Sequence, residues 1–336
     1  MADDFKYHID HHASLVRPPG LTGLQDDVEH AIQDALVRQR RLGLLGLSDG
    51  EFRRRNDLAV LYDAVAGFGE PGAGSPTAEL TGTVHAAEVR PVVGTLAATG
   101  RLVAAESAYL STHTDRSTML ALPAPGYVSA LADDADAGPV LAGVVRDEIG
   151  AVAADGVAYV LLRNPALGFL LRDEGRERAR SLGLDPDKTV AAMVDSENAA
   201  VAGLQLPENF CLGLDLTTAG QATGSWDRTA VADFLSRQAF GRLCVDHPAT
   251  ATFPVELLPG GLVVSLGVVD VSTSVLEDVD DVVAAIDAAA AVIDVDDIAI
   301  STNGGFHAAP SATAQTERAK LQLVETAARY FWGNEL

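Results

Sequence analysis

The sequence predicts an α/β fold, a single (β/α)8 TIM barrel that spans residues 1–336. Three observations predict this fold. The chain has 336 residues, 48% of them hydrophobic, and this length often forms one barrel with a large core. Eight short apolar runs alternate with helical patterns. The last run ends in the paired glycines Gly304 and Gly305 and then His307, as expected where a buried strand reaches the mouth of a site.

Each predicted strand is a short apolar run followed by a segment with helical periodicity. The runs are 7–15, 42–48, 118–122, 158–162, 210–216, 242–246, 262–269 and 298–301. The helical patterns are 24–41, 51–68, 138–154, 187–202, 227–240, 275–292 and 313–330. The stretch before the third strand breaks this rhythm, because it is rich in Thr and Val and has a turn signal at Gly100. It is predicted to be an inserted β-hairpin at residues 77–115, between the second helix and the third strand.

The composition limits the partners and the location of the protein. A net charge of −23 argues against nucleic acid and against anionic membranes as partners. Two cysteines, Cys211 and Cys244, do not make a disulfide framework, and a cytoplasmic location is expected. We expect a small-molecule substrate as the partner, and a homodimer is left open.

Polar residues gather where the predicted strands end. Catalytic residues of TIM barrels lie at the C-terminal ends of the strands, so these residues are candidates for a site. A strand period of two places Asp215 and Thr217 on one face, and likewise Cys244 and Asp246. For any one of them, a surface or capping role is an equal alternative. The candidates are Ser14, Arg17, Asp49, Glu51, Arg163, Asn164, Asp215, Thr217, Cys244, Asp246, His247, Asp270, Asn303 and His307.

Five motifs in order resemble the catalytic barrel of cobalamin-independent methionine synthase in its short single-barrel form. They are HHASLVRPPGL at 11–21, SDGEFRRR at 48–55, LPAP at 122–125, NGGF at 303–306 and the final helix AQTERAKLQLVETAARYFWG at 314–333. The resemblance covers nearly the whole chain and implies the barrel that this family shares with uroporphyrinogen decarboxylase. It implies that Ser14 and Glu51 hold the carboxylate and ammonium of an amino-acid substrate. His12, Arg17 and Asn303 lie in the matched motifs and are expected to contact substrate.

The positions that match the family's zinc ligands are substituted. The family uses His-x-Cys on the fifth strand, Glu on the sixth and Cys on the eighth, whereas this chain has Asp215, Thr217, Cys244 and Gly304. Threonine and glycine do not supply the donors that zinc needs. The substitutions therefore imply no metal and no cofactor, and a chain that is not a true methionine synthase. A rebuilt metal site from Asp215, Cys244 and His307 is the alternative.

The fourth strand departs from the family as well. It ends Arg163-Asn164-Pro165 where the family has Asp-Glu-Pro, which replaces a carboxylate by a guanidinium. Two interpretations stay open: the substrate presents an anion to Arg163, or Arg163 pairs with Glu51.

The remaining titratable residues define the predicted chemistry. Asp215, Cys244, Asp246 and His307 are expected to converge on one mouth, where histidine acts as acid or base and Cys244 is a nucleophile or a buried hydrophobe. The predicted function is a zinc-less enzyme, a transferase of alkyl or methyl groups or a lyase, acting on a small polar or anionic substrate. The alternative is a non-catalytic ligand-binding or regulatory barrel.

Overall fold

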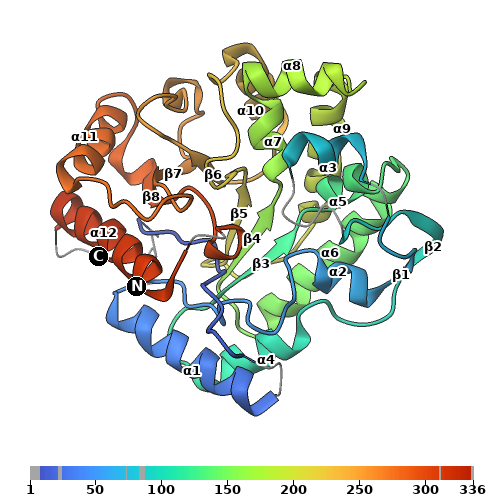
Figure 1. Ribbon diagram of the computed structural model, residues 1–336, viewed down its shortest axis with the longest axis horizontal. Coiled ribbons are helices and arrows are strands. Elements are labelled where there is room, and N and C mark those ends of the chain that lie inside the picture. Colours follow the sequence, from blue (N-terminus) through green and yellow to red (C-terminus); the bar gives the residue numbers. More distant parts are fainter. Residues whose placement is uncertain (1–7, 22–24, 73, 83–87, 310–311, 334–336) are drawn as a thin grey trace.

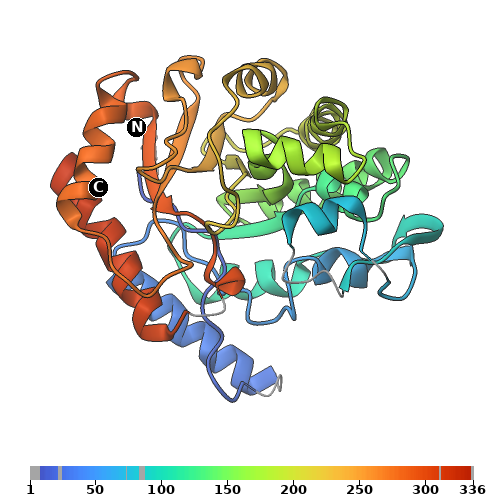
Figure 2. The same ribbon diagram turned by 45° about the horizontal axis from the view of Figure 1, so that its top comes forward.

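A computed structural model describes residues 8–21, 25–72, 74–82, 88–309 and 312–333. Within these residues, six parallel strands lie side by side in the order in which they follow one another along the chain. Helices surround the strands on the outside, as Figures 1 and 2 show from two directions. The strands are β3 (Met119–Pro123), β4 (Tyr159–Arg163), β5 (Cys211–Asp215), β6 (Arg242–Asp246), β7 (Val263–Val269) and β8 (Ile298–Thr302).

The first two predicted strands complete the ring through single parallel bridges instead of regular ladders. The bridges are Ile9 to Ile300, Ser14 to Gly50 and Leu47 to Thr118. Hydrogen bonds reinforce both ends of this connection: the Asp10 amide donates to the Ile300 carbonyl at 2.9 Å, and the Met119 amide donates to the Leu47 carbonyl at 2.9 Å. Positive φ angles at Ala13 (61°) and Gly50 (71°) interrupt the extended backbone here, which explains why these two strands are irregular. The barrel prediction is confirmed, although its first two strands pair with their neighbours only through isolated bridges.

The helices around the barrel begin at signals that can be read from the sequence. Asn164 caps α7, and Asp185, Asp227, Asp278 and Thr313 cap α9, α10, α11 and α12 with side-chain oxygens. The helices are α1 (Gln25–Arg41), α2 (Ala59–Ala64), α5 (Pro125–Leu131), α6 (Ala137–Ala154), α7 (Pro165–Leu170), α8 (Asp173–Ser181), α9 (Pro186–Val201), α10 (Arg228–Arg237), α11 (Val279–Ala290) and α12 (Ala314–Trp332). Short 3-10 turns lie at Val255–Leu257, Val295–Asp297 and Phe306–Ala308. No helix of the described chain is long and apolar enough to span a membrane.

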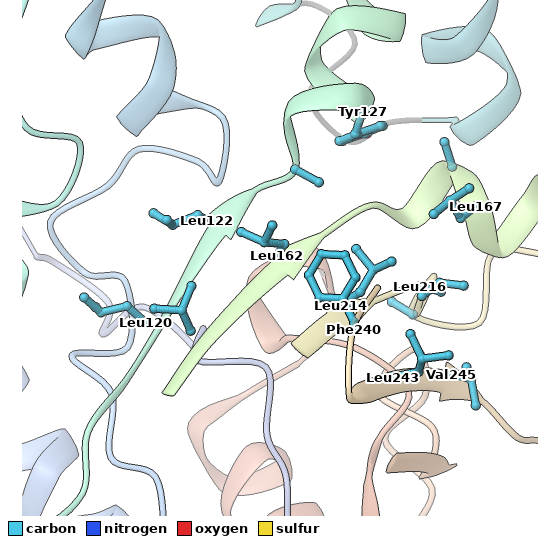
Figure 3. Close-up of a cluster of buried hydrophobic side chains, with 14 of the residues drawn as sticks. Leu120, Leu122, Tyr127, Leu162, Leu167, Leu214, Leu216, Phe240, Leu243 and Val245 are labelled. Carbon is cyan, nitrogen blue, oxygen red and sulfur yellow. The ribbon is translucent and has the colours of Figure 1, made fainter. Parts of the chain in front are cut away.

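The core has two layers because alternate residues of each strand face opposite sides. The larger layer fills the space between strands and helices, and Figure 3 shows its part around β3 to β6. That figure labels Leu120, Leu122, Tyr127, Leu162, Leu167, Leu214, Leu216, Phe240, Leu243 and Val245. The smaller layer lies inside the ring and comprises Ala13, Met119, Ala121, Tyr159, Leu161 and Cys244. Cys244, one of the candidate site residues, belongs to this inner layer.

The inserted segment differs from the predicted hairpin. An antiparallel pair is present, but it joins β1 (Val65–Phe68) to β2 (Val92–Ala98), so its first strand precedes residues 77–115. The described part of the insertion also holds two helices, α3 (Pro76–Thr81) and α4 (Ala104–His113). The turn assigned to Gly100 instead precedes α4, and the helix expected at 51–68 is limited to α2 before the chain enters β1. Antiparallel partners bridged by a helix lack the short-range turn signal that identifies a hairpin.

Candidate active site at the mouth of the barrel

The main pocket opens at the C-terminal ends of the strands, where TIM-barrel enzymes place their chemistry. Its empty space of about 750 Å³ includes volume open to solvent, and the neighbouring pocket beside Asp246 is larger, at about 990 Å³. We call it the main pocket because more of the predicted site residues line it. Residues after β4, β5 and β8 supply much of its wall, and α5 and α7 add two aromatic side chains. The lining residues are Ser14, Asp57, Thr81, Tyr127, Arg163, Pro165, Phe169, Asp215, Thr217, Thr218, Ala219, Gln221, Gly304, Gly305 and His307.

A buried ion pair joins the first segment to β5. His12 Nδ1 lies 2.7 Å from Asp215 Oδ2, and its Nε2 lies 2.8 Å from the Thr302 carbonyl oxygen. Since both partners can only accept, both ring nitrogens donate and His12 is an imidazolium. Burial lowers the pKa of His12, but the Asp215 charge and hydrogen bond outweigh it and raise that pKa above its usual value. Burial in turn raises the pKa of Asp215, and the His12 charge together with hydrogen bonds from Thr217 outweighs it and lowers that pKa.

A second buried network joins the SDGEFRRR motif to β4. Arg163 Nη1 donates to both carboxylate oxygens of Glu51, at 2.9 and 3.0 Å, and Nη2 donates to the His12 carbonyl. Arg54 also donates to Glu51, at 3.0 Å. Burial raises the pKa of Glu51, but the two guanidiniums outweigh it and lower that pKa. The internal pairing of Arg163 with Glu51, one of the two sequence interpretations, is therefore present. Arg163 lines the pocket and Glu51 lies buried behind it.

Three carboxylates share two guanidiniums in this network. Arg54 Nε donates to Glu106 at 2.7 Å, so Arg54 and Arg163 together match the charges of Glu51 and Glu106. Asp49 is the third carboxylate: its Oδ1 accepts the Glu51 amide at 2.9 Å, and its Oδ2 has no hydrogen-bond partner among the described residues. Burial, with the nearby Glu106 charge, raises the pKa of Asp49 to about 7.

Strained backbone is concentrated around the pocket. Among the described residues, four non-glycine residues have positive φ: Ala13 (61°), Glu51 (61°), Asp133 (53°) and Ala219 (52°). Ala219 lines the pocket, Ala13 precedes the lining residue Ser14, and Glu51 pairs with the lining residue Arg163. Each such conformation costs about 1–3 kcal/mol and persists only where neighbouring contacts enforce it. The positions of His12, Glu51 and the loop after β5 are therefore fixed in advance of any ligand.

The turn after β8 completes the wall. The His307 amide donates to Ser14 Oγ at 3.3 Å, and both residues line the pocket. A Cβ added to Gly305 would lie 2.1 Å from Ser14 Oγ, so only glycine allows this approach. His307 is half-buried and its proximity helps to lower the pKa of Glu51. The structure thus places Ser14, Arg163, Asp215 and His307 around one pocket, and Glu51 buried behind Arg163.

Asp246 and Asn303 lie at a neighbouring pocket instead. Thr218 separates the two spaces, since it lines the main pocket while its hydroxyl donates to Asp246 Oδ2 at 2.6 Å. Burial raises the pKa of Asp246 to about 6 even though Thr218 and Arg172 favour its charge. The Asn303 amide donates to Asp270 Oδ1 at 3.0 Å, where it holds the loop after β7. The expected convergence on one mouth is wrong for Asp246, because the loop after β5 lies between the two pockets.

Cys244 lies one strand period below Asp246, inside the ring, and not at the mouth. Its Sγ is 3.8 Å from Asp10 Oδ2, which also pairs with Arg242 at 2.7 Å. Burial and the Asp10 charge raise the pKa of this thiol well above its usual value. The buried-hydrophobe interpretation of Cys244 fits this environment, and the nucleophile interpretation does not.

Other candidates from the entry motif bind the protein itself. Arg17 donates to the Phe52 carbonyl at 2.7 and 2.8 Å and more weakly to that of Arg54, and it does not line the main pocket. His11 Nε2 lies 2.5 Å from the Gly46 carbonyl oxygen, and burial lowers the pKa of this histidine to about 4. His12 is likewise fully buried behind the wall. These residues position the site and do not face the pocket.

The four positions that resemble zinc ligands do not fit zinc. Both oxygens of Asp215 are engaged by His12 and Thr217, and Cys244 faces the interior of the ring. Gly304 has φ of +156°, and a Cβ there would lie 3.1 Å from Ala219, which leaves little room for a cysteine. No three His, Cys, Asp or Glu side chains of the described residues are grouped to hold a metal ion. The alternative site from Asp215, Cys244 and His307 is therefore not assembled.

Several pocket residues were missed by the sequence reasoning. Tyr127 and Phe169 supply the apolar wall, and Gln221 and Thr218 come from the loop after β5. The glycines and threonines of TTAGQATG, 217–224, were a signal for a loop that approaches a ligand closely, but nothing in the sequence showed that α5 would face the pocket.

Comparison with known proteins supports the fold. No protein-family model matches the chain. The uncharacterized protein YxjH of Bacillus subtilis (strain 168) is 26% identical over 332 residues, covering 92% of this chain and 86% of that protein. A structure of a B12-independent methionine synthase from Shewanella sp. W3-18-1, in complex with selenomethionine, matches with a TM-score of 0.76 at 19% identity, over 95% of this chain and 96% of that one. A Listeria monocytogenes structure provisionally assigned as the same kind of enzyme matches with a TM-score of 0.75 at 18% identity, over 98% of both chains. The chain has the fold of these methionine synthase barrels.

Proposed function

We propose that this barrel is an enzyme of the methyl- or alkyl-transfer type that acts on a small polar substrate in the main pocket, without zinc. The observation that carries the proposal is the strained backbone at and beside the main pocket, at the C-terminal ends of the strands. Ala219 lines this pocket, Ala13 precedes the lining residue Ser14, and Glu51 pairs with the lining residue Arg163. The shared fold adds to it, since the Shewanella methionine synthase was solved with selenomethionine, a small amino acid.

The pocket residues are assigned three roles: orienting the substrate, contacting its apolar part and accepting a proton. Ser14, Thr217 and Gln221 offer hydroxyl and amide groups that orient a polar substrate, and Tyr127 and Phe169 offer a surface for its apolar part. An imidazole can take a proton near neutral pH, and His307 is the histidine that lines the pocket. In the proposed step an acceptor S–H or N–H loses its proton to His307 as the acceptor forms a bond to the methyl carbon. The donor is a methylated sulfonium or a protonated N-methylated amine, and it leaves as a neutral sulfide or amine with the electron pair of the C–S or C–N bond that breaks.

An isotope experiment tests this function. Purified protein is incubated with a trideuteromethylated folate and a panel of thiols, and mass spectrometry follows the label. Transfer that persists with a chelator present and is lost in His307→Ala is the expected result. Zinc-dependent transfer, or transfer that His307→Ala leaves unchanged, would contradict the proposal. A thermal-shift panel of thiols, folates and small dicarboxylates guides the choice of substrates.

A ligand-binding barrel without catalysis is the second candidate. It is favoured by the pairing of the buried charges: Asp215 with His12, and Glu51 with Arg54 and Arg163. Ligands that raise the melting temperature without any label transfer, in wild type and His307→Ala alike, would select this candidate.

A further inference from the structure

The guanidinium of Arg163 has donors that the protein does not use. Arginine carries five N–H groups in a planar fork. Nη1 donates to both oxygens of Glu51, and Nη2 donates to the His12 carbonyl. The Nε–H and the second N–H of Nη2 take no partner among the described residues. Arg163 lines the main pocket with its side chain 12% exposed, whereas the Glu51 side chain behind it is 1% exposed.

The carboxylates near this arginine are already neutralised. Glu51 receives hydrogen bonds from Arg54 and Arg163, and Asp215 from the His12 imidazolium. A substrate ammonium would meet the guanidinium first and would find no uncompensated charge at either carboxylate. An anion would meet two free donors on neighbouring nitrogens of one guanidinium, a group that binds carboxylates well.

We infer that the main pocket selects a small monocarboxylate that lacks a free ammonium group, with Arg163 as the residue that determines this specificity. A single carboxylate fits because one guanidinium reaches the pocket and keeps two N–H groups that the described residues do not use. The inference depends on the proposed function only for the choice of this pocket, and it is tested by binding without turnover.

Asp57 is a carboxylate of the same pocket that would favour a substrate with an ammonium group. It is half-buried, lines the same pocket and belongs to the segment before α2. If Asp57 received an ammonium, amino acids would bind more tightly than the matching acids. The experiment therefore includes Asp57→Asn.

The inference is tested with three small molecules that have the same methylthioalkyl skeleton. They are 4-(methylthio)butanoate, methionine, and 3-(methylthio)propylamine, which carry the carboxylate alone, both charges, and the ammonium alone. Isothermal titration calorimetry should show the butanoate binding at least about tenfold more tightly than methionine, and the amine not binding. Arg163→Lys keeps the charge but loses the fork, and it should weaken butanoate binding about tenfold or more. Arg237→Gln, a surface arginine on α10, is the matched control and should bind like wild type.

Each contrary outcome overturns the inference. The inference is wrong if methionine or the amine binds more tightly than the butanoate. It is also wrong if Asp57→Asn abolishes the binding of amino acids. Equal affinities of wild type and Arg163→Lys, or no binding of any probe to wild type, would also refute it. If Arg163→Lys does not fold, the double variant Glu51→Gln/Arg163→Gln removes the pair together and should bind the butanoate more weakly. Selective butanoate binding without label transfer would refute the proposed reaction and leave this inference standing. Label transfer to amino-acid acceptors alone would support the proposed reaction and refute this inference.

Discussion

At the scale of single residues, the mouth of the barrel is built from compensated charges. Three cations, His12, Arg54 and Arg163, each contact a buried carboxylate within 3.0 Å. Such pairs add little net stability, because desolvation offsets much of the attraction, but breaking one leaves a buried charge without its partner. Their role here is to fix geometry.

Replacing Arg163 by alanine should therefore destabilise the protein by about 3–5 kcal/mol, because Glu51 loses one of its two guanidinium partners in a buried site. Chemical denaturation of wild type and Arg163→Ala measures this difference. The double variant Glu51→Gln/Arg163→Ala should recover much of the loss, since position 51 then carries no charge that has lost its partner. A double variant as unstable as Arg163→Ala alone would show that the cost arises elsewhere.

Asp49 should make stability fall as pH rises. Its folded pKa is about 7, above the unfolded value of about 3.9, so its stabilisation is fully present below the unfolded pKa and is lost as pH rises through the folded pKa. Between pH 4 and 8 wild type should lose up to about 4 kcal/mol that Asp49→Asn does not lose.

Denaturation at both pH values measures the effect of Asp49, and Asp287→Asn, an exposed position on α11, is the matched control. Identical pH dependence in wild type and Asp49→Asn would show that Asp49 does not hold the proton.

At the scale of elements, the site depends on turns that approach one another closely. The turn after β8 packs on the first segment at Gly305, and the strained loop after β5 separates the main pocket from its neighbour. These contacts join segments that are far apart in sequence. They explain why motifs at both ends of the chain belong to one site.

Gly305→Ala should destabilise the protein by about 1–3 kcal/mol and weaken ligand binding, because the added Cβ would lie 2.1 Å from Ser14 Oγ. Gly143→Ala is the matched control: this glycine lies within α6 with no atom within 4 Å of an added Cβ. It should raise stability by about 0.5–1 kcal/mol. Thermal denaturation compares the two, and a Gly305→Ala variant as stable as wild type would mean that the turn is not packed as described.

The sequence predicted elements whose signals are local. The strands from 118 onward are near their expected places, since each is a short apolar run. The inserted pair was misplaced because Val65–Phe68 reads as the end of a helix and finds its partner only at Val92–Ala98. Cys244 was placed at the mouth because periodicity gives the face of a residue but not its depth along the strand. The Asp49 network could not be predicted, since Glu106 comes from the insertion.

At the scale of the whole molecule, the chain shares its fold with solved methionine synthase barrels, and we propose that the chemistry at its mouth differs from theirs. The fold matches over at least 95% of the chain, while the four positions that the sequence resemblance matches to zinc ligands carry Asp215, Thr217, Cys244 and Gly304. A zinc-bound thiolate needs soft or imidazole donors in tetrahedral arrangement. Here Asp215 is paired with His12, Cys244 is buried inside the ring, and Gly304 has no side chain.

The zinc content of the purified protein tests this account most directly. The protein is prepared without a histidine tag or chelator and analysed by inductively coupled plasma mass spectrometry, alongside Asp215→Ala. The account predicts zinc far below one ion per chain in both, and no methionine formed from homocysteine and methylfolate. About one zinc per chain in wild type, lost together with activity in Asp215→Ala, would contradict it.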